Sequence, residues 1–166
     1  MNKRKNTIIK QIWAPWRLGY VQNAKKEKKG YCLFCSKFRS KMDKKNYVIK
    51  RDKYSFALLN IFPYNNGHIM IAPNRHINDL EYLRQKELMD MINLLIDMKL
   101  RLKRHIHPHG FNIGINCGTV AGAGIPGHIH IHIVPRWNGD TNFMPLFSNI
   151  RVIPQSLNAL YSLLTK

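Results

Sequence analysis

Short runs of apolar residues at strand-like spacing occur five times along the chain. The runs at 47–51, 55–59 and 68–72 are separated by segments that contain Asn, Asp, Pro and Gly, which are typical of turns. Two later runs, 111–116 and 128–134, are joined by a glycine-rich segment. The pattern predicts five short strands.

A different spacing governs residues 85–104, where apolar side chains recur every three or four positions. The predicted core face of this long helix consists of Leu88, Met91, Leu95, Met98 and Leu102. A similar spacing over 157–164 predicts a short helix near the C-terminus. Strands clustered around one long helix are typical of an α+β fold with an antiparallel sheet.

The 166 residues suffice for one domain with a sizeable hydrophobic core. We divide the chain into a basic N-terminal arm over residues 1–30, a folded domain over 31–154 and a C-terminal helix over 155–166 that packs on the same domain.

Charged and polar residues interrupt the segment 88–102, and the N-terminus lacks an apolar run, so we expect neither a membrane span nor a secretory signal. Three cysteines do not form a disulfide framework, which favours a cytoplasmic protein.

The formal net charge of +18 is distributed unevenly. The first 60 residues carry 17 Lys and Arg against 3 Asp and Glu. Such a field attracts polyanions, which keeps a nucleic-acid-binding protein among the alternatives. A Lys-rich solvated surface explains the same charge, and the lack of regular aromatic residues between the basic ones favours this second interpretation.

Three histidines, His128, His130 and His132, alternate with isoleucines near the end of the predicted sheet. Period-two geometry places the histidines on one face of a strand and the isoleucines on the other. Same-face histidines lie about 6.6 Å apart along a strand, close enough to share a zinc ion. Imidazoles in such a row can equally act as a nucleophile or as acid–base catalysts. The spacing alone does not choose between these chemistries.

The glycine-rich segment 118–127 precedes the histidines. It contains the pattern G-x-G-x-x-G at 122–127, but a strand follows where a dinucleotide-binding fold requires a helix, so that fold is rejected. Small residues between two strands can still expose backbone N–H groups to a phosphate. A flexible hairpin loop without a ligand is the alternative.

The run HIHIHIVPRW at 128–137 resembles the signature of the histidine triad family of nucleotide hydrolases and transferases. Four other segments resemble the branch of that family that contains bacterial diadenosine tetraphosphate phosphorylases. They are IWAPWRLGYV near the start, FALLNIFPYNNGHIMIAPNRH at 56–76, PHGFNIGINCGTVAGAGIPGH before the triad and PRWNGDTNF after it. The resemblance implies a five-stranded antiparallel sheet with one long and one short helix, in a homodimer joined edge to edge.

The same resemblance implies an enzyme that cleaves dinucleoside polyphosphates through a nucleotidyl-histidine intermediate, with inorganic phosphate as the acceptor. His130 would attack the α-phosphorus, His132 would bind a phosphate oxygen, and His128 completes the triad. The positions implied for nucleotide binding are Asn60, Ile61, Asn116, Gly122 and Gly124. Arg136, just after the triad, is expected to offset the charge of an anionic acceptor. The loop before the triad lacks the Gln or Ser of many relatives, so no side chain there is expected to assist the leaving group.

Cys32 and Cys35 form a C-x-x-C pair, which is typical of half a metal site. The resemblance implies that His76 and His128 complete a structural zinc site. Two reduced core cysteines beside a solvent-facing His76 are the alternative.

Three other functions compete with phosphorolysis. Water can replace phosphate as acceptor, in a hydrolase of dinucleoside polyphosphates or nucleoside phosphoramidates. The basic arm raises the possibility of a nucleic-acid-binding protein, although no Cys or His follows His132 to build an added zinc finger. A catalytic zinc on the triad itself would leave Cys32 and Cys35 unexplained.

Overall fold

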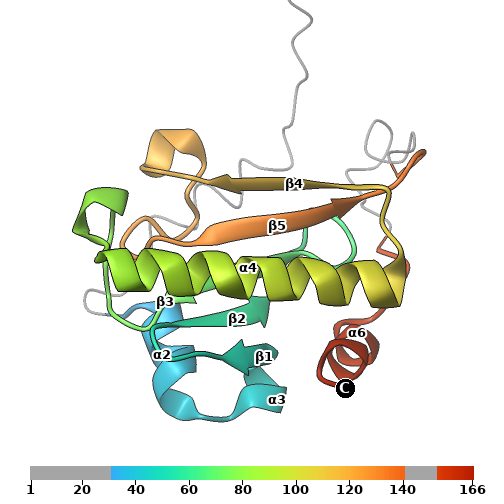
Figure 1. The fold of residues 1–166 in the computed structure, drawn as a ribbon, viewed down its shortest axis with the longest axis horizontal. Coiled ribbons are helices and arrows are strands. Elements are labelled where there is room, and N and C mark those ends of the chain that lie inside the picture. The colour runs from blue at the N-terminus through green and yellow to red at the C-terminus, as the bar shows by residue number, and fades with distance from the viewer. Residues whose placement is uncertain (1–30, 141–152) are drawn as a thin grey trace, which may run out of the picture.

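The computed structural model describes residues 31–140 and 153–166, and a five-stranded antiparallel sheet forms the centre of this part of the chain (Figure 1). The strands are β1 (Val48–Arg51), β2 (Ser55–Leu59), β3 (Ile69–Pro73), β4 (Gly110–Ile115) and β5 (Ile131–Arg136). Their order is β1-β2-β3-β5-β4, and every neighbouring pair is antiparallel. The α+β fold with a five-stranded sheet is confirmed. The arm predicted over 1–30 lies outside the described residues.

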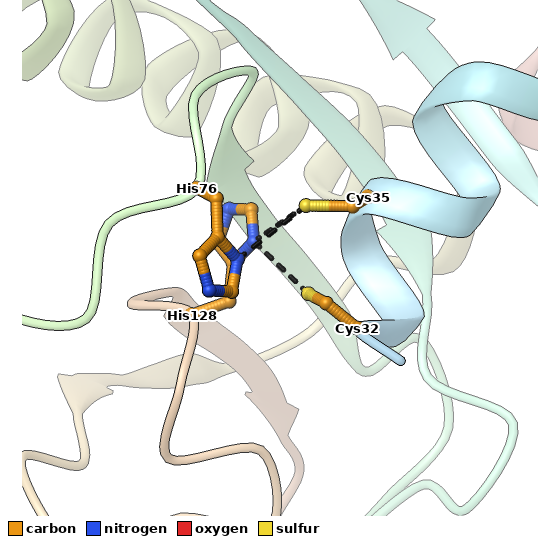
Figure 2. A group of neighbouring side chains, drawn as sticks. All are labelled: Cys32, Cys35, His76 and His128. Carbon is orange, nitrogen blue, oxygen red and sulfur yellow. Dashed lines mark hydrogen bonds between the residues drawn. The ribbon is translucent and has the colours of Figure 1, made fainter. Parts of the chain in front are cut away.

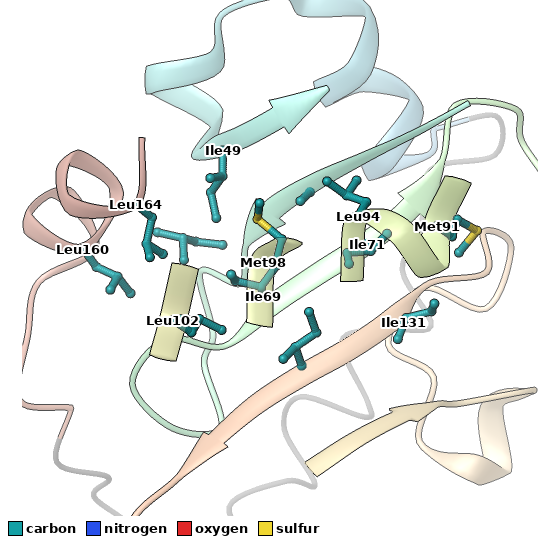
Figure 3. Packing of buried hydrophobic residues seen from close by; sticks show 13 residues of the cluster. Ile49, Ile69, Ile71, Met91, Leu94, Met98, Leu102, Ile131, Leu160 and Leu164 are labelled. Atoms are coloured by element: carbon teal, nitrogen blue, oxygen red, sulfur yellow. The ribbon is translucent and has the colours of Figure 1, made fainter. Parts of the chain in front are cut away.

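Helices α4 (Gln85–Ile106) and α6 (Leu157–Leu164) cover one face of the sheet with an entirely apolar core (Figure 3). The side chains of α4 that are buried in this core are Met91, Leu94, Met98 and Leu102. The prediction that Leu88 belongs to the core face is wrong, because its side chain is 41% exposed. Leu94 is completely buried instead, so the buried stripe of α4 is turned towards position 94 and away from positions 88 and 95. Leu95 is only partly buried.

The opposite face of the sheet packs against α2 (Leu33–Ser40), a helix that the sequence pattern did not predict. Its Phe34 is completely buried against Phe56 and Met70. A second short helix, α3 (Asp43–Asn46), follows directly. Two single-turn helices, η1 (Leu80–Tyr82) and η2 (Thr119–Ala121), complete the described elements.

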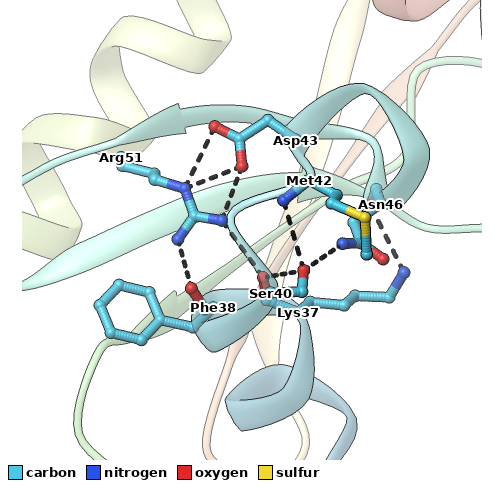
Figure 4. A network of polar contacts seen from close by, with 7 residues as sticks. All are labelled: Lys37, Phe38, Ser40, Met42, Asp43, Asn46 and Arg51. Atoms are coloured by element: carbon cyan, nitrogen blue, oxygen red, sulfur yellow. Dashed lines mark hydrogen bonds and ion pairs between the residues drawn. The ribbon is translucent and has the colours of Figure 1, made fainter.

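Arg51 at the end of β1 fixes the C-terminal end of α2 (Figure 4). Its guanidinium donates to the carbonyl oxygens of Lys37 and Phe38 (3.2 and 2.9 Å) and forms an ion pair with Asp43 of α3 (2.6 Å). Carbonyl groups in the last turn of a helix have no partner within the helix, so a guanidinium at this position satisfies them. The network orients α2, which carries the two cysteines at its beginning.

The triad lies partly outside the strand that was predicted to hold it. Strand β5 begins at Ile131, so His128 and His130 precede it. The ladder between β3 and β5 reaches only from Ile69 to Ile71, and β3 ends at Pro73, which has no N–H to extend the ladder. Instead, the Pro73 carbonyl oxygen lies 2.9 Å from Nε2 of His128. Both faces of this segment are buried.

Among the residues that the structure describes, no helix has the length and apolar character needed to span a membrane.

Candidate functional site

His130 is held so that one particular ring nitrogen remains available. Its side chain is 4% exposed, and its Nδ1 lies 2.8 Å from the backbone carbonyl oxygen of His128. A carbonyl oxygen only accepts hydrogen bonds, so Nδ1 of His130 carries the proton. The neutral ring then has its lone pair on Nε2. Burial lowers the pKa of His130, which keeps the ring neutral near pH 7.

His132 has the complementary arrangement, which a second histidine imposes. The backbone N–H of Tyr64 donates to Nδ1 of His68 (3.1 Å), so the proton of that ring is on Nε2. Nε2 of His68 therefore donates to Nδ1 of His132 (2.9 Å), and His132 carries its own proton on Nε2. This Nε2 is buried and has no partner among the described residues. Burial, together with the nearby His130, lowers the pKa of His132 to about 4.

The position of His68 depends on the glycine that precedes it. Gly67 has a φ of +76°, and a Cβ atom there would lie 2.8 Å from Cδ1 of Ile106 in α4. Only glycine combines this conformation with this close approach. The ring of Tyr64 then stacks on His68, with centroids 4.8 Å apart. His68 thus keeps the proton of His132 on Nε2 and is itself held by Tyr64.

The predicted nucleotide-binding positions form two groups in the structure. Asn60 and Ile61 follow β2, where Nδ2 of Asn60 lies 3.3 Å from Nδ1 of His68. The ring of His68 therefore connects Asn60 to the triad, and Ile61 is exposed beside it in the chain. The side-chain oxygen of Asn60 accepts from the backbone N–H of Phe62 (2.9 Å), which fixes the amide.

The second group is the loop after β4. Nδ2 of Asn116 donates to the carbonyl oxygen of Gly122 (3.3 Å), which holds the loop together. The N–H of Gly122 is used within the loop, because it donates to the carbonyl oxygen of Thr119 (3.0 Å). No such internal bond involves the N–H of Gly124 in the described part of the chain. Gly124 is therefore the better placed of the two glycines to bind a phosphate oxygen.

A second cluster, here called the metal cluster, brings together Cys32, Cys35, His76 and His128 (Figure 2). These residues come from the start of α2, the segment after β3 and the segment before β5. One ligand atom from each lies within 4.8 Å of all the others. The structure thus joins all four residues predicted to bind zinc.

The distances within the metal cluster suit a tetrahedral ion. Sγ of Cys32 lies 3.3 Å from Nδ1 of His128, and Sγ of Cys35 lies 3.4 Å from Nδ1 of His76. Zinc–sulfur and zinc–nitrogen bonds at tetrahedral angles place such atoms about 3.5 Å apart. Nε2 of His128 is occupied by the carbonyl oxygen of Pro73, so its Nδ1 lone pair faces the cysteines. The donor set and its orientation fit zinc.

The electrostatics of these groups follow from burial. Burial lowers the pKa of His128 to about 4, with a smaller effect from the nearby His76 and His130. Burial, followed by the adjacent Cys32, raises the pKa of the Cys35 thiol. Neither group is charged near pH 7 in the absence of a metal ion.

Phe34 contacts both His128 of the metal cluster and the neighbouring His130, and the sequence interpretation missed it. It lies between the cysteines in the chain, and its ring centroid is 5.1 Å from that of His128 and 4.8 Å from that of His130. The sequence did indicate that Phe34 is buried away from the cysteines. In a helical C-x-x-C, a residue between the two cysteines points away from the side of the helix that carries the sulfur atoms. Without the sheet register, however, the sequence could not show that it contacts the triad.

Comparisons with known proteins show which family and fold the chain resembles. The HIT domain model matches residues 41–139. The chain is 35% identical over 154 residues to a protein of Mycobacterium tuberculosis named AP-4-A phosphorylase, covering 90% of this chain and 79% of that one. It is 31% identical to the asymmetrical bis(5'-nucleosyl)-tetraphosphatase of Schizosaccharomyces pombe, covering 74% and 67% of the two chains. A Zn-bound histidine triad family protein from Mycobacterium smegmatis superposes with a TM-score of 0.66 at 28% identity, over 81% of this chain and 90% of that one.

Proposed function

The chain belongs to the histidine triad (HIT) family, and from this membership we propose that it cleaves dinucleoside polyphosphates such as diadenosine tetraphosphate. Relatives named for the cleavage of such compounds support the substrate class. The observation that carries the mechanism is the pair of complementary rings, His130 with a free lone pair and His132 with a free N–H. A nucleophile and a hydrogen-bond donor side by side suit attack on a phosphate.

In the first step, Nε2 of His130 attacks the α-phosphorus of the substrate. A nitrogen–phosphorus bond forms, and the bond from phosphorus to the bridging oxygen breaks, so that ATP leaves and AMP stays on His130. Nε2–H of His132 donates to a phosphate oxygen as charge develops there. The rigid hydrogen bond between His130 and its neighbour's carbonyl group aligns the attacking nitrogen before the substrate binds.

In the second step, an acceptor displaces His130 from phosphorus. Inorganic phosphate yields ADP, whereas water yields AMP. We propose phosphate, with support from the similarity to the AP-4-A phosphorylase. Arg136 supports this choice less than the sequence suggested, because its guanidinium is bound by Asp140 (2.6 Å) and by Asn112 (3.0 Å). The N–H of Gly124 is the group we propose to bind the acceptor or the transferred phosphate.

Product analysis tests the reaction. The purified protein is incubated with diadenosine tetraphosphate, with and without millimolar phosphate, and the nucleotides are separated by anion-exchange chromatography. We expect ADP and ATP, at a rate that rises with phosphate, and no products from His130→Ala. AMP and ATP at a rate independent of phosphate would make the protein a hydrolase, and intact substrate would refute the proposal.

We propose that the metal cluster holds one structural zinc ion. With four protein ligands and no open position, zinc here supplies cross-linking of the fold rather than catalysis. It joins α2 to the segments that carry His76 and His128, and so presses Phe34 against the nucleophile. Elemental analysis is expected to find about one zinc per chain.

We also propose a homodimer joined along β4. This strand is at the edge of the sheet and pairs only with β5 among the described strands. The outer face of α4 carries a row of exposed apolar side chains, namely Leu88, Ile92, Ile96 and Leu100. Lys99 of this helix lies over the ring of Phe111 in β4 (5.8 Å), which places the row beside the open strand edge. Such an apolar surface next to an unpaired edge favours association.

Light scattering tests the dimer. The wild-type protein is expected at about twice the chain mass of 19.5 kDa, and Ile92→Glu or Ile96→Glu at the mass of one chain. A wild-type protein of single-chain mass would overturn the proposed dimer.

A further inference from the structure

The two histidines of the metal cluster are held in different ways. His128 is buried, and its second ring nitrogen is bound to the carbonyl oxygen of Pro73. His76 is exposed, and in the described part of the chain no hydrogen bond holds its Nε2. A ligand without such an outer partner normally binds metal less well, because its ring is free to turn. The direction of the His76 side chain must therefore come from how its backbone is held.

The chain on both sides of His76 is fixed to the rest of the fold. The backbone N–H of Asn74 donates to the carbonyl oxygen of Tyr54 (2.8 Å). The carbonyl oxygen of Ile77 accepts from the backbone N–H of Ile129 (2.7 Å). These two bonds hold the ends of the loop, and the side chain of Asn74 adds two more, to the carbonyl oxygens of Asp52 and Lys53 (3.2 and 3.1 Å). Arg75, the residue directly before His76, makes a further attachment through its side chain.

Arg75 is bound to a buried carboxylate at the start of α4. Its Nε and Nη2 donate to the two oxygens of Glu87 (2.9 and 2.8 Å), and Nη2 also donates to the carbonyl oxygen of Tyr82 (2.8 Å). Glu87 accepts a third hydrogen bond from the backbone N–H of Arg84 (2.8 Å) and is 4% exposed. The bonds from Arg75 lower the pKa of Glu87 to about 2, so the carboxylate is charged at neutral pH.

We propose that Glu87, acting through Arg75, is a positioning residue for the metal ligand His76. A two-point ion pair fixes the orientation of a guanidinium as well as its distance, because both partners are planar. The carboxylate in turn is fixed by the first turn of α4, the helix that anchors the apolar core. The loop is thus attached to a helix whose buried face lies in the apolar core. The inference rests on the metal site proposed above.

Zinc affinity tests the proposal in Glu87→Gln, which keeps the shape of the side chain and removes its charge. Affinity is measured by competition with a chromophoric zinc chelator, and the ligand geometry by the absorption spectrum of the cobalt(II)-substituted protein. We expect the zinc affinity to fall about 10-fold, the lower end of the loss that follows removal of a direct outer partner of a metal ligand, because Glu87 acts on His76 through Arg75. Arg75→Gln, whose side chain is half-exposed, should give the same loss if Glu87→Gln folds poorly.

Two comparisons separate positioning from general stability. Asp97→Asn removes two other ion pairs of α4, to Lys50 of β1 (3.2 Å) and to Arg101 (3.4 Å), and should change zinc affinity less than twofold. In a His76→Ala background, Glu87→Gln should cause no further loss. Wild-type zinc affinity in both Glu87→Gln and Arg75→Gln, or an equal further loss without His76, would overturn the positioning role alone. A wild-type protein that binds no zinc would overturn the metal site and this inference together.

Discussion

The metal cluster and the proposed catalytic pair, His130 and His132, hold the same kind of side chain in opposite ways. In the metal cluster, two ring nitrogens and two cysteine sulfurs lie close enough to one another to bind a single metal ion. In the catalytic pair, each ring has one nitrogen bound within the protein and one left for a substrate. His128 belongs to the first cluster by its side chain and to the second by its carbonyl oxygen, which binds His130.

The difference shows that the partner of the second ring nitrogen decides what an imidazole does. A carbonyl oxygen on Nε2 turns the Nδ1 lone pair of His128 towards a metal ion. A carbonyl oxygen on Nδ1 leaves the Nε2 lone pair of His130 for nucleophilic attack. The N–H that His68 donates to Nδ1 of His132 leaves the proton of His132 on Nε2, so His132 is a donor at that atom. Three histidines in one short motif thus differ in which ring nitrogen is available, and the three roles proposed for them follow from three different neighbours.

The largest effect is expected from the catalytic side of the comparison. His130→Ala removes the attacking nitrogen and should lower turnover about 10³-fold or more. Zinc content should remain close to the wild-type value, because the imidazole of His130 is not one of the proposed metal ligands. Steady-state kinetics and elemental analysis measure the two effects, and near-normal turnover would exclude His130 as the nucleophile.

A smaller loss of turnover is expected when His132 keeps its ring but loses the hydrogen bond that fixes its proton on Nε2. His68→Ala removes the donor that fixes this proton and should lower turnover about 10–100-fold, less than the loss of a transition-state donor itself. His68→Gln offers an amide N–H near the same place and should recover part of the rate. If the two variants are equally impaired, the hydrogen bond to His132 does not explain the role of His68.

Cys32→Ala acts on the other cluster and should change stability before activity. Loss of one of four ligands weakens zinc binding, and with it the link between α2 and the sheet. We expect the melting temperature to fall by about 5–10 °C, which corresponds to roughly 2–3 kcal/mol in a chain of this size. Calorimetry and zinc analysis measure the effect, and turnover at 25 °C should fall much less than in His130→Ala. Unchanged stability in a zinc-free protein would contradict a structural ion.

The smallest effect concerns the pH dependence of stability. The pKa of His132 is about 4 in the folded protein and about 6.5 in the unfolded chain. Between these values the unfolded state binds a proton that the folded state does not, so stability falls as pH decreases from about 6.5 to 4. His132→Asn retains an acceptor for His68 and should flatten this slope. The lowered pKa of Glu87 affects stability in a separate pH range, below the ordinary carboxyl pKa of 4.5.

The comparison also explains what the sequence could predict. The cysteines and the triad histidines were identifiable because C-x-x-C and H-x-H-x-H have short, fixed spacings, whereas His76 was implied only by the family resemblance. The helix α2 was not, since its apolar face consists of little more than Phe34 and Phe38, too few positions to define a period. The start of β5 at Ile131 was also missed, because it depends on where Pro73 ends the neighbouring strand.

The proton positions could not be predicted at all. They depend on contacts between residues far apart in the chain, such as His68 with His132 and Pro73 with His128. Glu87 lies three positions after Arg84, a spacing that predicts a helix cap, but its bond to Arg75 appears only in the folded structure.

The central claim is that Nε2 of His130 forms a covalent bond to the substrate's α-phosphorus. Rapid quenching of the enzyme with diadenosine tetraphosphate in the absence of phosphate, followed by intact-protein and peptide mass spectrometry, tests it directly. We expect one AMP group per active site, located on His130 within residues 128–136, that disappears when phosphate is added and never forms in His130→Ala. An adduct on another residue, or complete turnover through His130→Ala, would contradict it.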